Sequence, residues 1–465
     1  MKTKIMSRGR RGPALALLAL ALALVAGCGF DEQRLVWSPD GKRAAVLNHG
    51  DFYLTDAEGK LSPKLAEDVT RVAWLDDSQR LVLAIARHVF DWPAVAQEIG
   101  AAKTQEVALA AEAVWKKIQA GTAWEEAAKE FELNNTNVLA LYLTQKHGAE
   151  LRAKVDDKTW KQIDGQAVVD VRQLVVARIE NDQLQLGAVL YHGLSDYADI
   201  RTAPGGRAVA FVVQTALEKQ GNVRLLVTPI DATEVVEVAT MVASFPDWTP
   251  DGRSVAYVQG AAESAGNGQV PQLGALIVRR VFADDGKVAL DPEPQALAGC
   301  ILTGQIRVRC LRDGRILFNT AEISLPISKA DGGNEREQLF AIDPSRQSTL
   351  VRLVPRSGEN RLPQGLTFFE PSPDGRRVLF GGENGEVMVL EIVTGEINEV
   401  QPAGGDLSGA PQWRNAEEFS FTRRNSEKDG VKPAHECDLV LRRADDPKKE
   451  TVLSAAWPAE MLKAK

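Results

Sequence analysis

One pattern of apolar and polar residues recurs along most of the chain. Each copy has an apolar residue or Trp, a short polar turn, and a run in which apolar and polar residues alternate. Pro presets φ in such a turn, Asp bonds its own backbone and Gly supplies a positive φ, so each copy predicts a strand–turn–strand hairpin. The seven copies are VWSPDGKRAAVLN (36–48), AWLDDSQRLVLAI (73–85), RTAPGGRAVAFVV (201–213), DWTPDGRSVAYVQ (247–259), RCLRDGRILFN (309–319), EPSPDGRRVLFGG (370–382) and QWRNAEEFSFTRR (412–424).

A second pair of strands usually follows the hairpin, as in residues 51–66 and 386–400. Four antiparallel strands that recur every 40 to 60 residues or so are typical of a β-propeller blade. One blade cannot bury both faces of its sheet alone, so the unit has to recur until the ring closes. We therefore predict an all-β propeller over residues 35–457, with seven four-stranded blades; six or eight remain alternatives.

The repeated phrase resembles the TolB/Tricorn-type propeller repeat, which also occurs beside the catalytic domain of prolyl oligopeptidase-like peptidases. Its WSPDG core is clearest at residues 36–48, 247–259 and 370–382. The resemblance covers roughly residues 34 to 457 outside one insertion. It implies a propeller that holds membrane-associated protein partners.

One insertion, at about residues 90–165 in blade 2, has helical character instead. Apolar residues in 102–121 follow a spacing of three and four, which fits an amphipathic helix ending at Gly121. Thr122 and Asn137 are the expected N-caps of two further helices, 122–131 and 137–155. Four of the nine tryptophans lie here and predict a small independent core: Trp92, Trp115, Trp124 and Trp160.

The first 27 residues are typical of a bacterial lipoprotein signal peptide. A basic stretch precedes about 13 apolar residues, too few to cross a bilayer as a helix. Val25-Ala26-Gly27-Cys28 then resembles a lipobox, in which Cys28 receives a diacylglycerol thioether and an acylated amine. An ordinary secretory signal with a chance cysteine is the alternative. We expect residues 28–34 to link the lipid to the propeller, and Gly29 favours the outer membrane, facing the periplasm or the cell surface.

Charge and composition narrow the function. Without the five basic residues of the signal peptide, 50 Lys and Arg face 63 Asp and Glu, a net charge of −13. Such an acidic body has no electrostatic reason to bind nucleic acid. The five His residues are scattered, without the spacing of a helical metal site. We therefore expect no metal and no cofactor.

Two groups of side chains invite a functional interpretation. The turn carboxylates Asp40, Asp251, Asp313 and Asp374 resemble acid–base candidates, but they occur once per blade and are expected to form the turns. Cys310 occupies the Trp position of blade 5 and is expected to be a small buried residue. A Cys300–Cys310 disulfide is the alternative that an oxidising compartment allows.

The predicted function is a non-enzymatic, lipid-anchored scaffold of the cell envelope that binds proteins through its long loops and helical insertion. A hydrolase would need a nucleophile turn, and the nearest string, residues 193–197, lacks its last glycine. We predict no catalytic residue. A small-ligand or glycan-binding propeller is the alternative, and an enzyme sited in the central channel is a further one.

Overall fold

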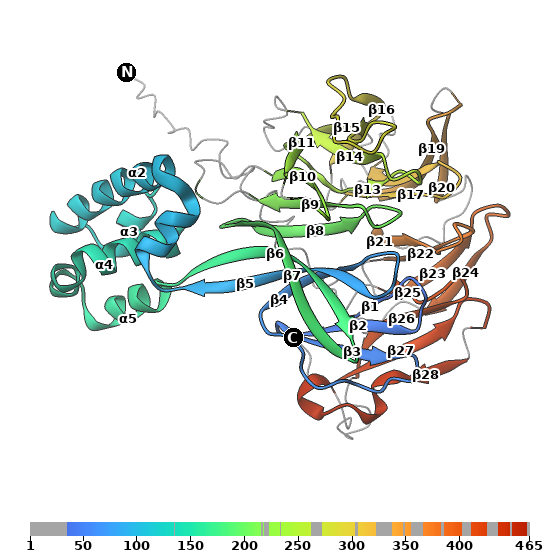
Figure 1. The fold of residues 1–465 in the computed structure, drawn as a ribbon, viewed down its shortest axis with the longest axis horizontal. Coiled ribbons are helices and arrows are strands. Elements are labelled where there is room, and N and C mark those ends of the chain that lie inside the picture. Colours follow the sequence, from blue (N-terminus) through green and yellow to red (C-terminus); the bar gives the residue numbers. More distant parts are fainter. Residues whose placement is uncertain are drawn as a thin grey trace, which may run out of the picture.

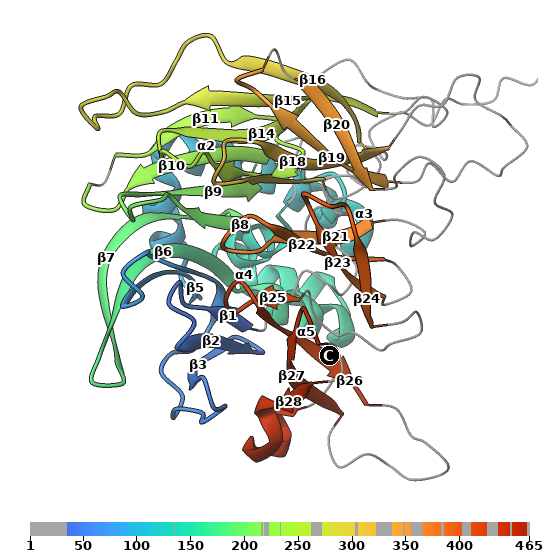
Figure 2. The ribbon, with the colours of Figure 1, turned by 90° about the vertical axis from the view of Figure 1, so that its right-hand side faces the viewer.

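The computed structural model describes residues 35–133, 135–214, 217, 223–232, 234–261, 272–302, 306–321, 337–346, 349–354, 366–382, 386–401, 411–425, 436–446 and 449–462. Within these residues the chain forms seven sheets arranged as blades, with a group of helices at one side (Figure 1). Viewed from the side away from the helices, the blades surround a common centre (Figure 2). The predicted seven-bladed propeller is confirmed.

Each blade is built from strands that are consecutive in the chain. Blades 1 to 3 contain β1 (Leu35–Trp37), β2 (Arg43–Asn48), β3 (Asp51–Asp56); β4 (Val69–Trp74), β5 (Arg80–Val89), β6 (Val169–Glu180), β7 (Gln183–Gly193); and β8 (Asp196–Thr202), β9 (Ala208–Gln214), β10 (Val223–Pro229), β11 (Val236–Thr240). Blades 4 and 5 contain β13 (Asp247–Trp248), β14 (Ser254–Gly260), β15 (Gln272–Arg280), β16 (Gln295–Leu302); and β17 (Ile306–Cys310), β18 (Ile316–Ala321), β19 (Glu337–Asp343), β20 (Thr349–Val354). Blades 6 and 7 contain β21 (Leu366–Pro371), β22 (Arg377–Gly382), β23 (Val387–Glu391), β24 (Ile397–Gln401); and β25 (Gln412–Trp413), β26 (Glu418–Arg424), β27 (Cys437–Arg443), β28 (Glu450–Val452).

The seven predicted hairpins are the two innermost strands of the seven blades. Their turns have the expected backbone, with positive φ at Gly41, Gly252, Gly314 and Gly375. One inner strand is broken. Pro246 lacks an N–H and separates β13 from β12 (Ser244–Phe245), which pairs in parallel with β17 of blade 5.

The outermost strands at the two chain ends are shorter than the sequence suggests. In blade 1 the fourth strand is reduced to single bridges, Phe52 to Ala66 and Thr55 to Leu61. In blade 7 the outermost strand, β28, ends at Val452, and a 3-10 helix, η2 (Leu453–Ala456), follows it. A second one, η3 (Ala459–Leu462), ends the described chain. Blade 7 nevertheless supplies its own fourth strand.

Because no strand is shared between blades 7 and 1, side chains close the ring. Leu35 and Trp37 of blade 1 pack in one core with Leu439 and Leu441 of blade 7. The indole of Trp457 donates a buried 2.7 Å hydrogen bond to the carbonyl oxygen of Gly59. Several short contacts therefore replace the missing mixed sheet.

Tryptophans of the repeat connect blades 2, 4 and 7 to the blade before each of them. The indole nitrogens of Trp74, Trp248 and Trp413 donate to carbonyl oxygens of the preceding blade, at 2.9 to 3.0 Å. The acceptors are Val36, Arg201 and Glu370, and each lies one residue before the Trp position of its own strand. One repeated residue thus satisfies a buried donor and fixes the distance between neighbouring inner strands.

The insertion forms four helices between β5 and β6, which we call the helical module (residues 92–166). They are α2 (Trp92–Gln119), α3 (Trp124–Ala128), α4 (Thr136–Lys154) and α5 (Asp157–Gln166). Gly100 interrupts α2 with a φ of 76°. Trp115 and Trp124 are buried in an apolar core, and Trp92 and Trp160 pack against it, so the core predicted from the tryptophans is present. It is not independent of the propeller, because Val89, Val169 and Val171 of blade 2 and Leu217 of blade 3 belong to the same cluster.

Both predicted N-caps are wrong by one or two residues. α3 begins after Ala123, without a side-chain cap, rather than after Thr122. α4 is capped by Asn135, whose side chain accepts from the Val138 N–H. The Asn137 side chain donates instead to the carbonyl of Val168, which precedes β6. Periodicity locates a helix, whereas the choice between neighbouring polar caps depends on these tertiary contacts.

The module lies at the end of the blades opposite the repeat turns. β5 begins after the turn of blade 2 and runs away from it, so the chain enters the module at the far end (Figure 1). β1 also begins at that end, since Leu35 pairs with Val46 and Trp37 with Ala44 nearer the turn. The start of the propeller and the module therefore share one face, which we call the module face.

Gly59 offers a test of the ring closure. It has a φ of +87°, and a Cβ there would overlap the main chain of Leu453 in blade 7. We expect Gly59→Ala to lower the free energy of unfolding by roughly 2–4 kcal/mol, from backbone strain and displacement of this contact. Gly121, with a φ of +97° and nothing within 4 Å of such a Cβ, is the matched control.

Gly121→Ala should cost only about 1 kcal/mol of backbone strain. Urea unfolding of the two variants measures the difference. Equal destabilisation would contradict a closure that depends on this contact.

Candidate functional site

The central channel contains one ring of side chains that the repeat positions directly. These residues lie one position before the Trp position of each inner strand. In chain order they are Val36, Ala73, Arg201, Asp247, Arg309, Glu370 and Gln412. The residues of blades 7, 1 and 2 are uncharged, whereas those of blades 3 to 6 alternate in sign. The channel is therefore asymmetric.

A recurring bulge positions a second ring, two residues earlier. The pairing register shifts between Val69 and Arg71 in β4, and at the equivalent place in β8 and β21. A bulge re-aims the side chains beside it. Arg71 and Asp199 follow these bulges and line the channel, together with Phe245 and Arg307 from β12 and β17.

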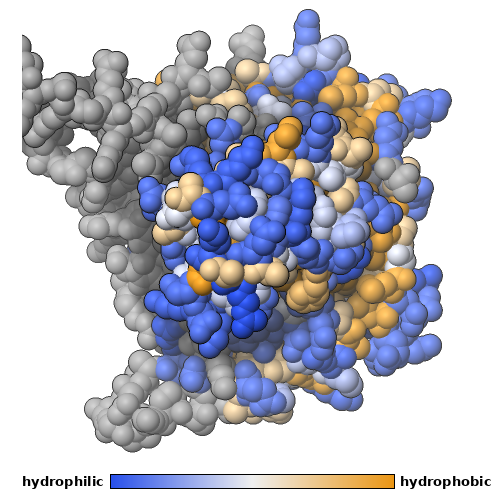
Figure 3. All heavy atoms as spheres, turned by 90° about the vertical axis from the view of Figure 1, so that its left-hand side faces the viewer, coloured by the Kyte–Doolittle hydropathy of each residue, from blue (hydrophilic) through white to orange (hydrophobic). Residues whose placement is uncertain are grey.

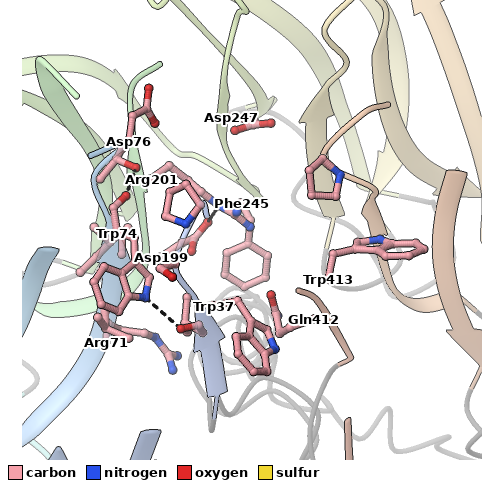
Figure 4. Close-up of a pocket in the computed structure, with 18 of the residues that line it drawn as sticks. Trp37, Arg71, Trp74, Asp76, Asp199, Arg201, Phe245, Asp247, Gln412 and Trp413 are labelled. Atoms are coloured by element: carbon pink, nitrogen blue, oxygen red, sulfur yellow. Dashed lines mark hydrogen bonds and ion pairs between the residues drawn. The ribbon is translucent and has the colours of Figure 1, made fainter. Parts of the chain in front are cut away.

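A cavity of about 390 Å³ occupies the channel and is lined by residues of all seven blades, most of them from blades 7, 1, 2 and 3. Figure 4 shows Arg71, Asp199, Arg201, Phe245 and Gln412 among the side chains that line it. Five arginines and three aspartates line it: Arg71, Arg201, Arg307, Arg312, Arg414, Asp76, Asp199 and Asp247. The cavity remains open where the first ring has Val36, Ala73 and Gln412.

The opposite side of the channel is filled by an ionic network. Arg309, only 1% exposed, donates from Nε to Glu370 Oε2 at 2.7 Å. Arg201 bonds Asp199 Oδ2 at 3.2 Å and lies 3.8 Å from the same Glu370 oxygen. These pairs join blades 3, 5 and 6 across the channel. Breaking a buried pair by removing one partner strands the other charge, so the network favours one arrangement of the blades.

Burial and neighbouring charges shift the pKa values of this network in opposite directions. Burial raises the pKa of the Glu370 carboxyl, although Arg201 and Arg307 lower it in part. Burial also disfavours the charge of Arg201, but Asp199, Glu370 and Asp247 outweigh it and raise the pKa of Arg201. The Arg201 guanidinium therefore keeps its charge, and the pKa values of the carboxyl groups around it depend on that charge.

Asp247 is another titratable group of the network. Its Oδ2 accepts the Cys310 N–H at 2.8 Å, which joins blade 4 to blade 5. Burial raises its pKa to about 7, because desolvation exceeds the opposing effects of Arg201 and the backbone donors. Near neutral pH this carboxyl is partly protonated.

The turn carboxylates do what the sequence predicted of them. Asp40 accepts from Ser38 Oγ at 2.7 Å and the Lys42 N–H at 3.1 Å, and the equivalent turns repeat the pattern. Asp251, Asp313 and Asp374 also accept the N–H two residues later. Each therefore belongs to its own turn, and the four do not converge on one pocket.

Cys300 and Cys310 are free thiols in this structure, as is Cys437. Cys300 lies buried in β16 of blade 4, in an apolar cluster. Cys310, in β17 of blade 5, packs against that cluster and is only partly buried, rather than fully buried as predicted. The alternative disulfide between them is not formed here. Cys28, the predicted lipidation site, and the rest of residues 1–34 lie outside the described residues, as do most of the long loops 260–274, 320–338 and 424–436.

Polar contacts hold blade 2 to the base of the helical module. Glu98 of α2 bonds Arg87 of β5 and accepts from His192 Nδ1 of β7 at 2.6 Å. Gln145 of α4 donates to the carbonyl of Phe90 at 2.6 Å. Lys103 reaches blade 3, where it bonds the carbonyl of Leu217 at 3.1 Å. Contacts from two helices to two blades restrict movement of the module.

A polar cluster joins α2 to α4 inside the module. Glu112 Oε1 accepts from Tyr142, Lys146 and His147 at 2.9 to 3.0 Å, and the Trp115 ring stacks on His147. Burial opposes ionisation of Glu112, but its three donors lower its pKa to about 2. Its position between two helices identifies it as a packing contact.

The outward surface of the module is mostly hydrophilic, with scattered apolar residues (Figure 3). Leu109 of α2 is 67% exposed, and Phe90, just before α2, is 68% exposed. Among the described residues no group of His, Cys, Asp and Glu is arranged to hold a metal ion. No helix in the described part is long and apolar enough to cross a membrane.

The channel residues were not predicted, although the sequence contains a signal for them. When the seven copies are aligned on the turn, Arg201, Asp247, Arg309 and Glu370 fall at the same position, directly before the Trp position. Charge in an otherwise apolar inner strand indicates a side chain that faces away from the sheet packing. The alternating charges at this position therefore indicate the network.

No protein-family model and no curated protein matches the chain. Solved structures with a similar fold include TolB from Acinetobacter baumannii, at 15% identity and a TM-score of 0.39, which covers 59% of this chain and 58% of the TolB chain. The β-propeller domain of the Trilobed protease from Pyrococcus furiosus has 9% identity and a TM-score of 0.49, covering 90% of this chain and 95% of that domain. Kuenenia stuttgartiensis hydrazine synthase has 13% identity and a TM-score of 0.42, covering 77% and 76%.

This chain thus spans less than two thirds of the TolB structure it matches. The similar structures include TolB, a protease propeller and an oligogalacturonate lyase. They assign no activity to this chain.

The raised pKa of Asp247 makes stability depend on pH. A carboxyl whose pKa is higher in the folded chain binds its proton more tightly there, so its contribution to stability falls as pH rises. Asp247→Asn removes this titration and keeps an acceptor for the Cys310 N–H. Between about pH 4 and pH 8, we expect the free energy of unfolding of the native protein to fall by roughly 4 kcal/mol relative to Asp247→Asn, since each unit of pKa difference contributes about 1.4 kcal/mol.

Urea unfolding at several pH values measures this difference. Asp251→Asn is the control, because hydrogen bonds from Thr249 and Arg253 outweigh burial and lower the pKa of Asp251. The stability that Asp251 contributes is therefore lost only below about pH 4. A difference for Asp247→Asn that does not change with pH would refute the assignment.

Proposed function

We propose that this protein is a non-enzymatic, lipid-anchored propeller of the bacterial cell envelope that binds other envelope proteins through its module face. The observation that carries the proposal is the helical module itself. Its apolar core continues into β5 and β6 of blade 2 and includes Leu217 of blade 3, and polar contacts also hold it to these two blades. A rigidly held helical surface is pre-organised for binding, which lowers the entropic cost of association.

The anchor would bring this face to the membrane. Cys28 lies seven residues before Leu35, a span of at most roughly 25 Å. β1 begins at the module face. A lipid on Cys28 would therefore hold the module near the bilayer surface, where membrane-associated proteins are accessible. We place the protein on the periplasmic side of the outer membrane, or on the cell surface, from the residue after the cysteine.

Lipidation is tested by Cys28→Ser. We expect the native protein to incorporate a radiolabelled fatty acid and to sediment with membranes, because two or more acyl chains anchor stably. Cys28→Ser should lose both the label and the sedimentation. Cys300→Ser, a buried propeller cysteine, is the control and should retain both. A labelled Cys28→Ser would place the lipid elsewhere, and an unlabelled native protein would reject the anchor.

The partner surface is tested by charge substitution on the module. Leu109→Glu adds a charge to an exposed position of α2, where folding should be unaffected because the side chain is 67% exposed. Val393→Glu is the matched control, since Val393 is 88% exposed and lies after β23, in the turn at the opposite face. Partners cross-linked in native membranes are identified by mass spectrometry for both variants and for a chain with residues 92–164 replaced by a Gly/Ser linker.

We expect a specific envelope protein to be retained by Val393→Glu, weakened several-fold by Leu109→Glu and lost from the folded linker variant. An unchanged partner set in the linker variant would move the binding surface away from the module. No specific partner in any sample would reject the scaffold function.

A further inference from the structure

Charged side chains of opposite sign are concentrated where the helical module meets the propeller. We call this group the module joint. Its basic members are Arg87, His88, Arg172 and His192. Its acidic members are Asp68, Glu98, Asp170 and Asp196. They come from the linker before β4, from β5, β6 and β7 of blade 2, from α2 and from β8 of blade 3, so the joint connects the module to two blades.

His88 lies between two carboxylates that belong to different elements. Its Nδ1 is 2.7 Å from Asp170 Oδ1, across the β5–β6 pair, and its Nε2 is 3.5 Å from Asp68 Oδ1. A neutral imidazole has one N–H, so one of its nitrogens then directs a lone pair at a carboxylate. A protonated imidazole carries an N–H toward both. The hydrogen bond to Asp170 is the main reason that the pKa of His88 is raised; burial opposes it, and the charges of Asp170 and Asp68 add to it.

His192 makes the corresponding contact with the module. Its Nδ1 lies 2.6 Å from Glu98 Oε2, and Arg87 bonds the other oxygen of the same carboxylate. Gln173, which pairs with His192 in the β6–β7 register, is uncharged. Protonation of His192 therefore gives Glu98 a second cationic partner and converts the contact between α2 and β7 into a charge-assisted hydrogen bond.

Arg172 extends the joint to blade 3. Its Nε donates to Asp196 Oδ1 at 3.1 Å, and its Nη2 lies 3.4 Å from Asp170 Oδ2, the oxygen that His88 does not contact. With both histidines protonated, four cations face the four carboxylates of the joint; with both neutral, only the two arginines remain. Only the protonated joint is balanced in charge.

We propose that the module joint is a pH-sensitive device, in which protonation of His88 and His192 tightens the attachment of the helical module to blades 2 and 3. Each pair is partly exposed and weak by itself, but these pairs share partners and form one network. The shared apolar core keeps the module attached at every pH. What changes is how often the root of the module, residues 86–91 and 167–173, opens locally.

The raised pKa of His88 fixes the direction of the effect. A group with a raised pKa contributes stability that is fully present below its unfolded value, about 6.5 for histidine. That stability is lost as pH rises through the folded value. The joint is therefore tight below about pH 6.5 and loosens as pH rises above it.

A consequence for partner binding rests on the proposed function. If partners bind through the module, a tighter joint lowers the entropic cost of holding the binding surface in place, and binding strengthens at lower pH. The pH response of the joint itself is a property of the protein alone and is measured without a partner.

Hydrogen–deuterium exchange of the full-length protein in detergent, corrected for the intrinsic effect of pH on exchange, measures local opening. We expect the protection of residues 86–91 and 167–173 to fall roughly three- to tenfold between about pH 6 and pH 8.5. Protection of β14 in blade 4, which lies outside the joint, should not change. Equal protection of the module root at both pH values would overturn the proposal.

Two double variants separate the charge of the histidines from their packing. His88→Gln with His192→Gln removes both titrating charges and should give the lower protection at both pH values. His88→Arg with His192→Arg supplies charges that do not titrate and should give the higher protection at both. The two side chains are 47% and 55% exposed, so the variants should fold, which circular dichroism checks.

Arg178→Gln is the control, because it removes an exposed pair with Glu180 on the same sheet and should keep the native pH response. A pH response that persists in the double Gln variant would assign it to other groups and refute the proposal. Partner cross-linking at the two pH values is measured in parallel. A joint that responds to pH, with no change in partner binding, would confirm the device and count against binding through the module.

Discussion

The ring depends on a recurring hydrogen bond between neighbouring blades. The donor is the indole N–H of an inner-strand Trp, and the acceptor is a main-chain carbonyl of the preceding blade, one residue before that blade's own Trp position. It is made by Trp74, Trp248 and Trp413. Where the repeat lacks Trp, another polar contact joins the blades: Thr202 donates to the Trp74 carbonyl, and the Cys310 N–H donates to Asp247. A buried indole or amide without an acceptor is costly, so each contact both requires and fixes the next blade.

This spacing determines what the channel contains. The residue whose carbonyl accepts the indole is the same residue whose side chain enters the channel, as Val36, Arg201 and Glu370 show. One residue thus has two roles. Its main-chain carbonyl joins the blades, and its side chain lines the channel. The main-chain role is indifferent to residue type, so the side chain is free to vary from blade to blade. That freedom allows charge on one side of the channel and an open cavity on the other.

The helical module and the cavity give one scaffold two distinct surfaces. The module is joined to the propeller through blade 2 and through Leu217 of blade 3, which bonds Lys103 and packs in the same apolar cluster as the helices. The cavity, in contrast, is lined by residues of all seven blades. The polar cluster around Glu112 holds the helices of the module together, and the hydrogen bond between Glu98 and His192 holds the module to blade 2.

The sequence by itself determined the seven hairpins, the insertion point and the helical module, because these depend on local periodicity and turn chemistry. It also determined that Asp40 and its equivalents form turns. The N-caps Asn135 and Ala123, the short outer strands at both chain ends and the position of Arg71 and Asp199 were decided by tertiary structure. A bulge shifts which residues face the channel, and the pairing of Arg309 with Glu370 joins residues 61 positions apart. Such contacts follow from how the blades meet, which no local pattern encodes.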